Sequence, residues 1–201
     1  AIPQGDLRMA TSMDELNLRL RSLVHGLVPP LEEMRALAAC LQKVHALVTA
    51  VYPTAKLQPF GSCMSSFAVR NSDVDLCLVM APEAPGEEIE KAKVVKELGE
   101  FLEESGMEGV QALTHARVPI VKLVEPETKI ACDICVNNLL PLANTKLLRD
   151  YASIDPRLRN LVYLVKHWAR QRDVNNTYRG TLSSYAYAVM CIHLLQTRNP
   201  P

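Results

Sequence analysis

The sequence predicts an α+β fold: a small sheet domain with helices before it and after it. Short runs rich in Val, Leu and Ile lie between residues 52 and 142, whereas apolar residues recur with a helical period over residues 11–51 and again after about residue 140. The chain has 201 residues, of which 48% are apolar and 22% charged, so it has the composition of a globular protein with a sizeable core.

The N-terminal part is predicted to be helical. Residues 1–10 are interpreted as a linker, and residues 11–51 as helices that pack with the later helical domain. Pro29 and Pro30 interrupt the periodic spacing, and the second helix is expected over LEEMRALAACLQKVHALVTAV. We expect no bilayer-spanning segment, because no apolar run is long enough.

Residues 52–142 are predicted to form the sheet domain. AKLQPFGS is typical of a strand that ends in a turn, and DVDLCLVM of a second strand buried on both faces. A helix with a charged outer face is expected over EEIEKAKVVKELGEFLEES. GVQALTHARVPIVKLV then indicates one or two strands, and KIACDICV indicates another.

Residues 143–201 are predicted to begin a helical domain that is truncated at the end of this sequence. In DPRLRNLVYLVKHWARQR, Asp155 is the expected N-cap and Pro156 the first helical residue. The last helix is expected within GTLSSYAYAVMCIHLLQTR.

Charge and cysteine usage narrow the possible functions. The formal net charge is zero, so overall charge gives no indication of nucleic-acid binding. The six cysteines lie mostly in apolar contexts, which favours reduced, buried thiols in a reducing compartment. Cys132 and Cys135 would point to opposite faces of one strand, which disfavours a zinc site.

Two acids in an apolar strand are the strongest functional signal. Asp73 and Asp75 are two residues apart, so on a strand their side chains share one face, where they repel each other. Divalent cations such as Mg²⁺ would neutralise them. Asp133, another lone acid in a short apolar strand, is the candidate third ligand. The alternative is that one or more of these acids caps a turn or pairs with a lysine.

A turn before the first of these strands supports a phosphate site. Gly61 allows close backbone approach, and Ser62 offers a hydroxyl and an N–H. If CMSSF begins a short helix, its first N–H groups are placed to bind phosphate oxygens.

The Gly-Ser turn, the D-x-D strand and the third strand Asp together resemble the DNA polymerase β-like nucleotidyltransferase superfamily. ARVPIVKL, CDICVNN, NTKLLRDYASIDPRLRNLVYLVKHWAR and GTLSSYAYAVMCIHLLQ are similar to non-canonical poly(A) polymerases and terminal uridylyltransferases, most of all to plant cytoplasmic RNA uridylyltransferases. The resemblance covers about Leu31 to Pro201. It implies a mixed catalytic sheet with flanking helices, followed by a poly(A) polymerase-associated-like helical domain.

The resemblance also implies roles for individual residues. The metal-binding and catalytic acids would be Asp73, Asp75 and Asp133. The nucleotide-binding residues would be Gly61, Ser62, Lys166, Arg170 and Ser184 at the triphosphate, Asn144 and Thr145 near the ribose and base, and Tyr185 stacked on the base. From the residues alone, Lys166 and Arg170 share a helix face that could equally be a solvated basic face, and Tyr185 could be a half-buried core tyrosine.

The implied function is template-independent transfer of UMP from UTP to RNA 3′ ends, as in mRNA tailing and mRNA decay. The implied cofactor is Mg²⁺ or Mn²⁺. The resemblance also implies a monomeric core that acts in the cytoplasm without membrane contact. Its protein partners would bind outside this fragment. Two alternatives stay open: a poly(A) polymerase that uses ATP, and an inactive transferase kept as a scaffold or RNA-binding module.

Overall fold

The structure is a computed structural model that describes residues 13–82 and 88–198. The predicted linker and much of the predicted APEAPGEE loop lie outside these residues. The chain divides into two compact units, one of Pro29–Asp155 and one of Ala1–Val28 with Pro156–Pro201. The first unit contains the sheet, and the described residues of the second form helices and no strand.

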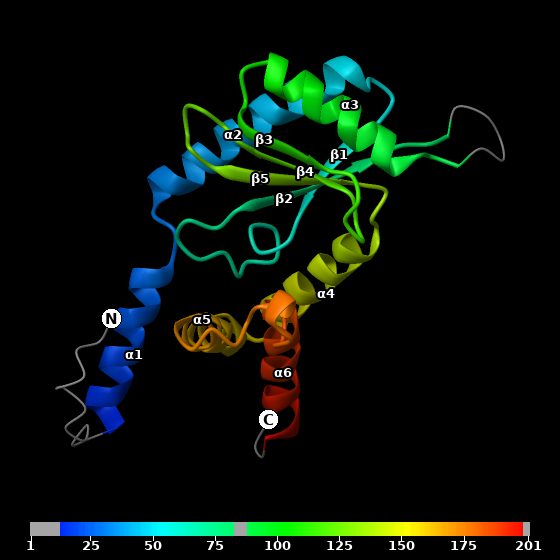
Figure 1. The fold of residues 1–201 in the computed structure, drawn as a ribbon. Coiled ribbons are helices and arrows are strands. Elements are labelled where there is room, and N and C mark those ends of the chain that lie inside the picture. The colour runs from blue at the N-terminus through cyan, green and yellow to red at the C-terminus, as the bar shows by residue number, and fades with distance from the viewer. Residues whose placement is uncertain (1–12, 83–87, 199–201) are drawn as a thin grey trace. The chain divides into compact units, whose positions relative to one another are not determined.

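The sheet has five strands, which appear together in the upper part of Figure 1. They are β1 (Lys56–Phe60), β2 (Val74–Val79), β3 (Glu108–Leu113), β4 (Ile120–Val124) and β5 (Ala131–Val136). Their order is β1-β2-β5-β4-β3, with β2 and β5 parallel and the other neighbours antiparallel. The sheet is therefore mixed, and the predicted α+β fold class is confirmed. GVQALTHARVPIVKLV forms two strands.

Two helices, α2 (Leu31–Val51) and α3 (Lys91–Glu104), cover one face of the sheet (Figure 1). The core on that face consists of helix residues and alternate strand residues. Its members include Cys40, Val44, Val48, Val74, Leu76, Leu78, Val95, Leu98, Leu102, Val121, Leu123, Cys132 and Ile134. Because strand side chains alternate, the residues between these core positions point to the opposite face of the sheet. That second face carries the polar residues of β2, β4 and β5.

The predicted domain boundaries differ from the compact units in two places. The expectation that all of residues 11–51 pack with the helical domain is wrong for α2, because its apolar residues are part of the sheet core. α4 (Leu140–Ile154) also belongs to the sheet unit, so the division falls at Asp155–Pro156 rather than near residue 142. α1 (Met13–Leu27) belongs to the other unit and contacts α5.

One helical stretch, Met13–Val51, contains a window with a mean hydropathy of 1.2 that is apolar and long enough to cross a membrane. Within the stretch, α1 ends at Leu27 and α2 begins at Leu31, after Pro29 and Pro30. The buried face of α2 packs on the sheet, as the core helix of a globular domain does. The window therefore gives little support for a membrane span.

The helical unit contains α5 (Pro156–Gln171), a short 3₁₀ turn (Thr177–Arg179) and α6 (Ser184–Thr197). Pro156 begins α5 as predicted. Ser183 caps α6, because its side-chain oxygen accepts a hydrogen bond from the Ala186 N–H at 3.1 Å. Trp168 packs edge-on against Tyr187, with ring centroids 6.3 Å apart.

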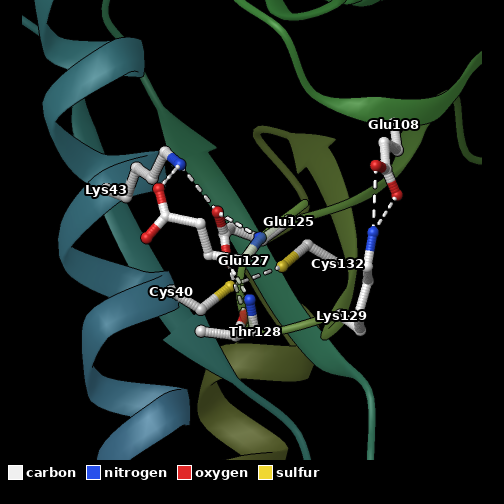
Figure 2. Close-up of polar contacts among 8 residues, drawn as sticks. All are labelled: Cys40, Lys43, Glu108, Glu125, Glu127, Thr128, Lys129 and Cys132. Carbon is white, nitrogen blue, oxygen red and sulfur yellow. Dashed lines mark hydrogen bonds and ion pairs between the residues drawn. The ribbon is translucent and has the colours of Figure 1, made fainter.

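A buried carboxylate joins α2 to the turn between β4 and β5 (Figure 2). Glu125 is 1% exposed and accepts hydrogen bonds from Lys43 Nζ at 2.8 Å and from the N–H and hydroxyl of Thr128, each at 2.6 Å. Burial alone raises the pKa of Glu125, but Lys43 and these hydrogen bonds outweigh it and lower the pKa to about 2. The contact fixes how β4 leads into β5.

Candidate active site

Two of the three predicted acids lie side by side. Asp75 of β2 and Asp133 of β5 are directly paired across the parallel strands, and Lys122 of β4 is paired with Asp133 on its other side. All three point away from α2 and α3, because their neighbours along each strand are in the core. Strand pairing thus produces a row of charges, Lys122–Asp133–Asp75, across three adjacent strands.

The third acid, Asp73, lies before β2 rather than within it, which corrects the prediction that both acids of D-x-D lie on the strand. Its side chain is exposed, and its carbonyl oxygen accepts a hydrogen bond from Cys63 Sγ at 3.4 Å. Among the described residues, no three His, Cys, Asp or Glu side chains are grouped closely enough to hold a metal ion as they stand.

Asp133 forms an ion pair in this structure. Lys122 Nζ lies 2.6 Å from Asp133 Oδ2, and the two side chains are 45% and 30% exposed. The alternative weighed above, that one of the acids pairs with a lysine, therefore holds for Asp133. A lysine pair and a metal role are compatible, because the same carboxylate can exchange one cation for another.

Gly61 lies directly against Asp75. Its φ is +76°, and a Cβ on this residue would lie 2.1 Å from Asp75 Oδ2. Only glycine meets both conditions, since it has no Cβ and adopts positive φ without strain. The glycine of the Gly-Ser turn thus allows the chain to pass beside the carboxylate.

Thr145 of α4 holds this turn in place. Its hydroxyl accepts a hydrogen bond from the Gly61 N–H at 2.9 Å and donates one to the Pro141 carbonyl at 2.7 Å. The residue is 8% exposed. The resemblance placed Thr145 and its neighbour Asn144 near the nucleotide, and the structure shows that the Thr145 hydroxyl also supports the turn that borders Asp75.

The segment after Gly61 is a series of turns. The short helix considered at CMSSF does not form, because the chain turns at Ser66, whose φ is 69°. Ser62 therefore lies in a turn rather than before a helix N-terminus. The segment is tied to α2 farther along, where the Asn71 N–H donates to Glu33 Oε1 at 2.5 Å.

The other four predicted residues belong to the helical unit. Lys166 and Arg170 lie one turn apart on α5, the first half-buried and the second exposed. Ser184 and Tyr185 lie in the first turn of α6, and Asn175 Nδ2 donates to Ser184 Oγ at 3.4 Å.

The C-x-x-C pair is divided between the two faces of the sheet. Cys132 faces α2, where its sulfur lies 3.4 Å from that of Cys40. Cys135 interacts with Cys77, its partner on β2, on the face that carries Asp75. The hydrogen bond with Cys135 lowers the pKa of Cys77 to about 7, and the same bond and burial raise the pKa of Cys135. The prediction that the two cysteine side chains point to opposite faces of the strand is confirmed.

Sequence reasoning missed Lys122 and Glu33. Lys122 had a usable signal, since it is the lone charge in the short apolar strand IVKLV, the same feature that identified Asp133. Glu33 had none, because an acid in the first turn of a helix is common and nothing in the sequence connects it to Asn71.

A mixed sheet of this topology, with paired acids beside a Gly-Ser turn, is the polymerase β-like nucleotidyltransferase fold. Residues 16–153 match the family described as "Poly(A) RNA polymerase, mitochondrial-like, central palm domain", and the chain belongs to this family.

Curated relatives fall into two groups. The chain is 35% identical to human terminal uridylyltransferase 7 over 174 residues, which is 86% of this chain and 12% of that protein. It is 37% identical to fission yeast (Schizosaccharomyces pombe) terminal uridylyltransferase cid1 over 177 residues, 85% of this chain and 42% of cid1. It is 32% identical to Xenopus laevis poly(A) RNA polymerase GLD2-B over 198 residues, 98% of this chain and 39% of that protein. The chain thus spans less than half the length of these relatives.

Solved structures agree with the fold. The Cid1 poly(U) polymerase mutant bound to MgATP matches with a TM-score of 0.84 and 33% identity, over 94% of this chain and 59% of that chain. Cid1 in complex with its short product ApU matches with a TM-score of 0.77 and 33% identity, over 89% and 54%. The predicted resemblance to uridylyltransferases and poly(A) polymerases is confirmed, whereas the one to the plant enzymes stays a prediction.

Proposed function

We propose that this chain contains the catalytic centre of a template-independent RNA nucleotidyltransferase that adds UMP from UTP to RNA 3′ ends. The pairing of Asp75 with Asp133 on adjacent parallel strands beside the Gly61 turn is the observation that carries the proposal. Relatives that are terminal uridylyltransferases or poly(A) polymerases support the same class of reaction.

Two of the acids, Asp75 and Asp133, fit a divalent cation. Asp75 and Asp133 offer oxygen ligands from neighbouring strand positions on one sheet face, and Asp73 lies two residues before Asp75. Oxygen ligands of this kind suit Mg²⁺ or Mn²⁺. When bound, the ions supply Lewis-acid stabilisation of the phosphate charge and make the RNA 3′-hydroxyl easier to deprotonate.

The protein residues have separate roles in the reaction. Asp133 orients the RNA 3′-hydroxyl and helps to accept its proton. The hydroxyl oxygen forms a bond to the α-phosphorus in line with the bond to the β-phosphate, which breaks, and pyrophosphate leaves. Ser62 binds a phosphate oxygen through its hydroxyl or N–H.

The remaining nucleotide contacts follow the family pattern. Lys166 and Arg170 would neutralise the charge of the triphosphate, and Ser184 would bind it through a hydrogen bond. Asn144 and Thr145 would lie near the ribose and base, and Tyr185 would stack on the base. Tyr185 is 37% exposed, which leaves part of its ring available for such a contact.

The test uses intact protein, a short RNA with a free 3′-hydroxyl, Mg²⁺ and each nucleoside triphosphate supplied separately. Extension with UTP that is lost when Asp73→Ala and Asp75→Ala are combined is the expected result. Extension mainly with ATP would favour the second candidate, a poly(A) polymerase, which the similarity to GLD2-B supports. No extension with any nucleotide would contradict transferase activity and favour the scaffold interpretation.

The oligomeric state, the cellular compartment and the place of partner binding are proposals as well. We propose a monomeric core that acts in the cytoplasm on mRNA 3′ ends, with protein partners bound outside these 201 residues. None of the six cysteines forms a disulfide in the structure and five are buried, which suits a reducing compartment. Light scattering after size exclusion and cell fractionation test the monomer and the compartment.

A further inference from the structure

The row Lys122–Asp133–Asp75 puts two negative charges beside each other and one positive charge at the end. Side chains at directly paired strand positions lie roughly 5 Å apart at Cβ. The two carboxylates therefore repel each other, and Lys122, at 2.6 Å from Asp133 Oδ2, offsets part of that repulsion. The proposed cations would act on the same carboxylates.

Lys122 is held in this position by the fold. Val121 and Leu123, the residues on either side of it, are 0% and 2% exposed in the core, so β4 cannot slide by one residue without exposing them. Glu125, one residue after the strand, is bound to Lys43 of α2 and to Thr128 (Figure 2). The pairing of Lys122 with Asp133 is thus a fixed feature of the hairpin.

Resting on the proposed function, we propose that Lys122 is a positioning residue that serves as a built-in counter-ion of Asp133. Its ammonium group forms an ion pair with the Asp133 carboxylate when no divalent cation is bound, and it competes with the cation for that carboxylate. Cation binding then replaces the ion pair, which frees the Lys122 ammonium on the acid face of the sheet.

Replacing Lys122 should raise the affinity for the metal ion rather than lower it. A residue that merely supports the fold would weaken metal binding when it is replaced. A competing cation would strengthen metal binding when it is removed, because Asp133 no longer has to leave a partner and one positive charge near the metal is gone. Exposed ion pairs of this kind are weak, so the expected gain is about two- to fivefold in affinity.

The experiment measures Mn²⁺ binding to the intact protein without nucleotide or RNA, from the electron paramagnetic resonance signal of free Mn²⁺. Lys122→Met removes the charge and keeps most of the side-chain length. Lys122→Arg keeps the charge. Lys129→Met is the matched control, since Lys129 lies on the same hairpin but pairs with Glu108 at 2.8 Å. Asp133→Asn identifies the binding that depends on Asp133.

We expect Mn²⁺ to bind Lys122→Met about two- to fivefold more tightly than the wild type, and Lys122→Arg and Lys129→Met with wild-type affinity. Heating should also show a larger Mn²⁺-induced rise in Tm for Lys122→Met. If Lys122→Met binds Mn²⁺ no more tightly than the wild type, while Asp133→Asn abolishes Mn²⁺ binding, the counter-ion role of Lys122 is overturned and the metal role of Asp133 stands. Wild-type binding that Asp133→Asn does not reduce would overturn the metal role of Asp133, and the counter-ion proposal with it.

Discussion

Replacing Gly61 by alanine is the most direct test of the site geometry. The added Cβ would lie 2.1 Å from Asp75 Oδ2, far inside van der Waals contact, and the residue would have to keep a φ of +76°. Asp75 must then turn away from its position beside Asp133, or the turn must move. Either response displaces a proposed metal ligand.

A second glycine separates the effect of the collision with Asp75 from the effect of backbone strain at positive φ. Gly106 has a φ of +84°, and nothing lies within 4 Å of a Cβ built on it, so Gly106→Ala carries the backbone strain without the collision. That strain is about 1–2 kcal/mol. For a chain of this size it lowers the Tm by roughly 2–8 °C. Gly61→Ala should lose more stability than this, and a misplaced catalytic group costs on the order of 100-fold in rate.

The assay compares kcat/KM for RNA extension, and Tm, in both variants. Gly61→Ala should lose about 100-fold in kcat/KM, while Gly106→Ala stays within about twofold of the wild type. In an Asp75→Ala background only the Cβ of residue 75 still lies near the added Cβ, at 3.3 Å, so the extra stability that Gly61→Ala loses relative to Gly106→Ala should become much smaller. Equal stability losses in the wild-type background, with activity kept in both variants, would refute the proposed contact between Gly61 and Asp75.

Three further predictions concern residues around the site. Thr145→Val should destabilise the protein by about 1–3 kcal/mol in chemical denaturation, because the Gly61 N–H loses its acceptor, and Thr145→Ser should recover most of the loss; an unchanged midpoint in Thr145→Val would contradict this. The pKa of Glu125 is lowered from 4.5 to about 2 in the folded state, so the stability that Glu125 contributes is present above pH 4.5 and is lost as the pH falls toward 2. The difference in unfolding free energy between the wild type and Glu125→Gln should therefore shrink over that interval, and a constant difference would contradict this prediction. Cys63 is the one cysteine that is not buried, so a thiol reagent should modify one thiol quickly in the native protein and none in Cys63→Ser; several fast thiols in the wild type would show that the buried cysteines are accessible.

The sequence by itself determined the kinds of elements and most of the candidate acids. When one face of a helix or strand is buried, apolar residues recur in the sequence with the period of that element. The kind of each element could therefore be predicted from the spacing of its apolar residues. Asp133 could be found because a lone charge in a short apolar strand needs a compensating partner. The Gly-Ser pair could be found because its distance from the acids is short along the chain.

Only the tertiary structure decided which residues meet. Periodicity shows that the faces of α2 and α4 are buried but not what covers them, so their place in the sheet unit could not be predicted from the pattern alone. The pairing of Lys122 with Asp133 and the approach of Gly61 to Asp75 both follow from strand register, which joins residues distant in sequence. A one-residue change of register would move every side chain of a strand to the other face, and the packing of the whole core fixes that choice.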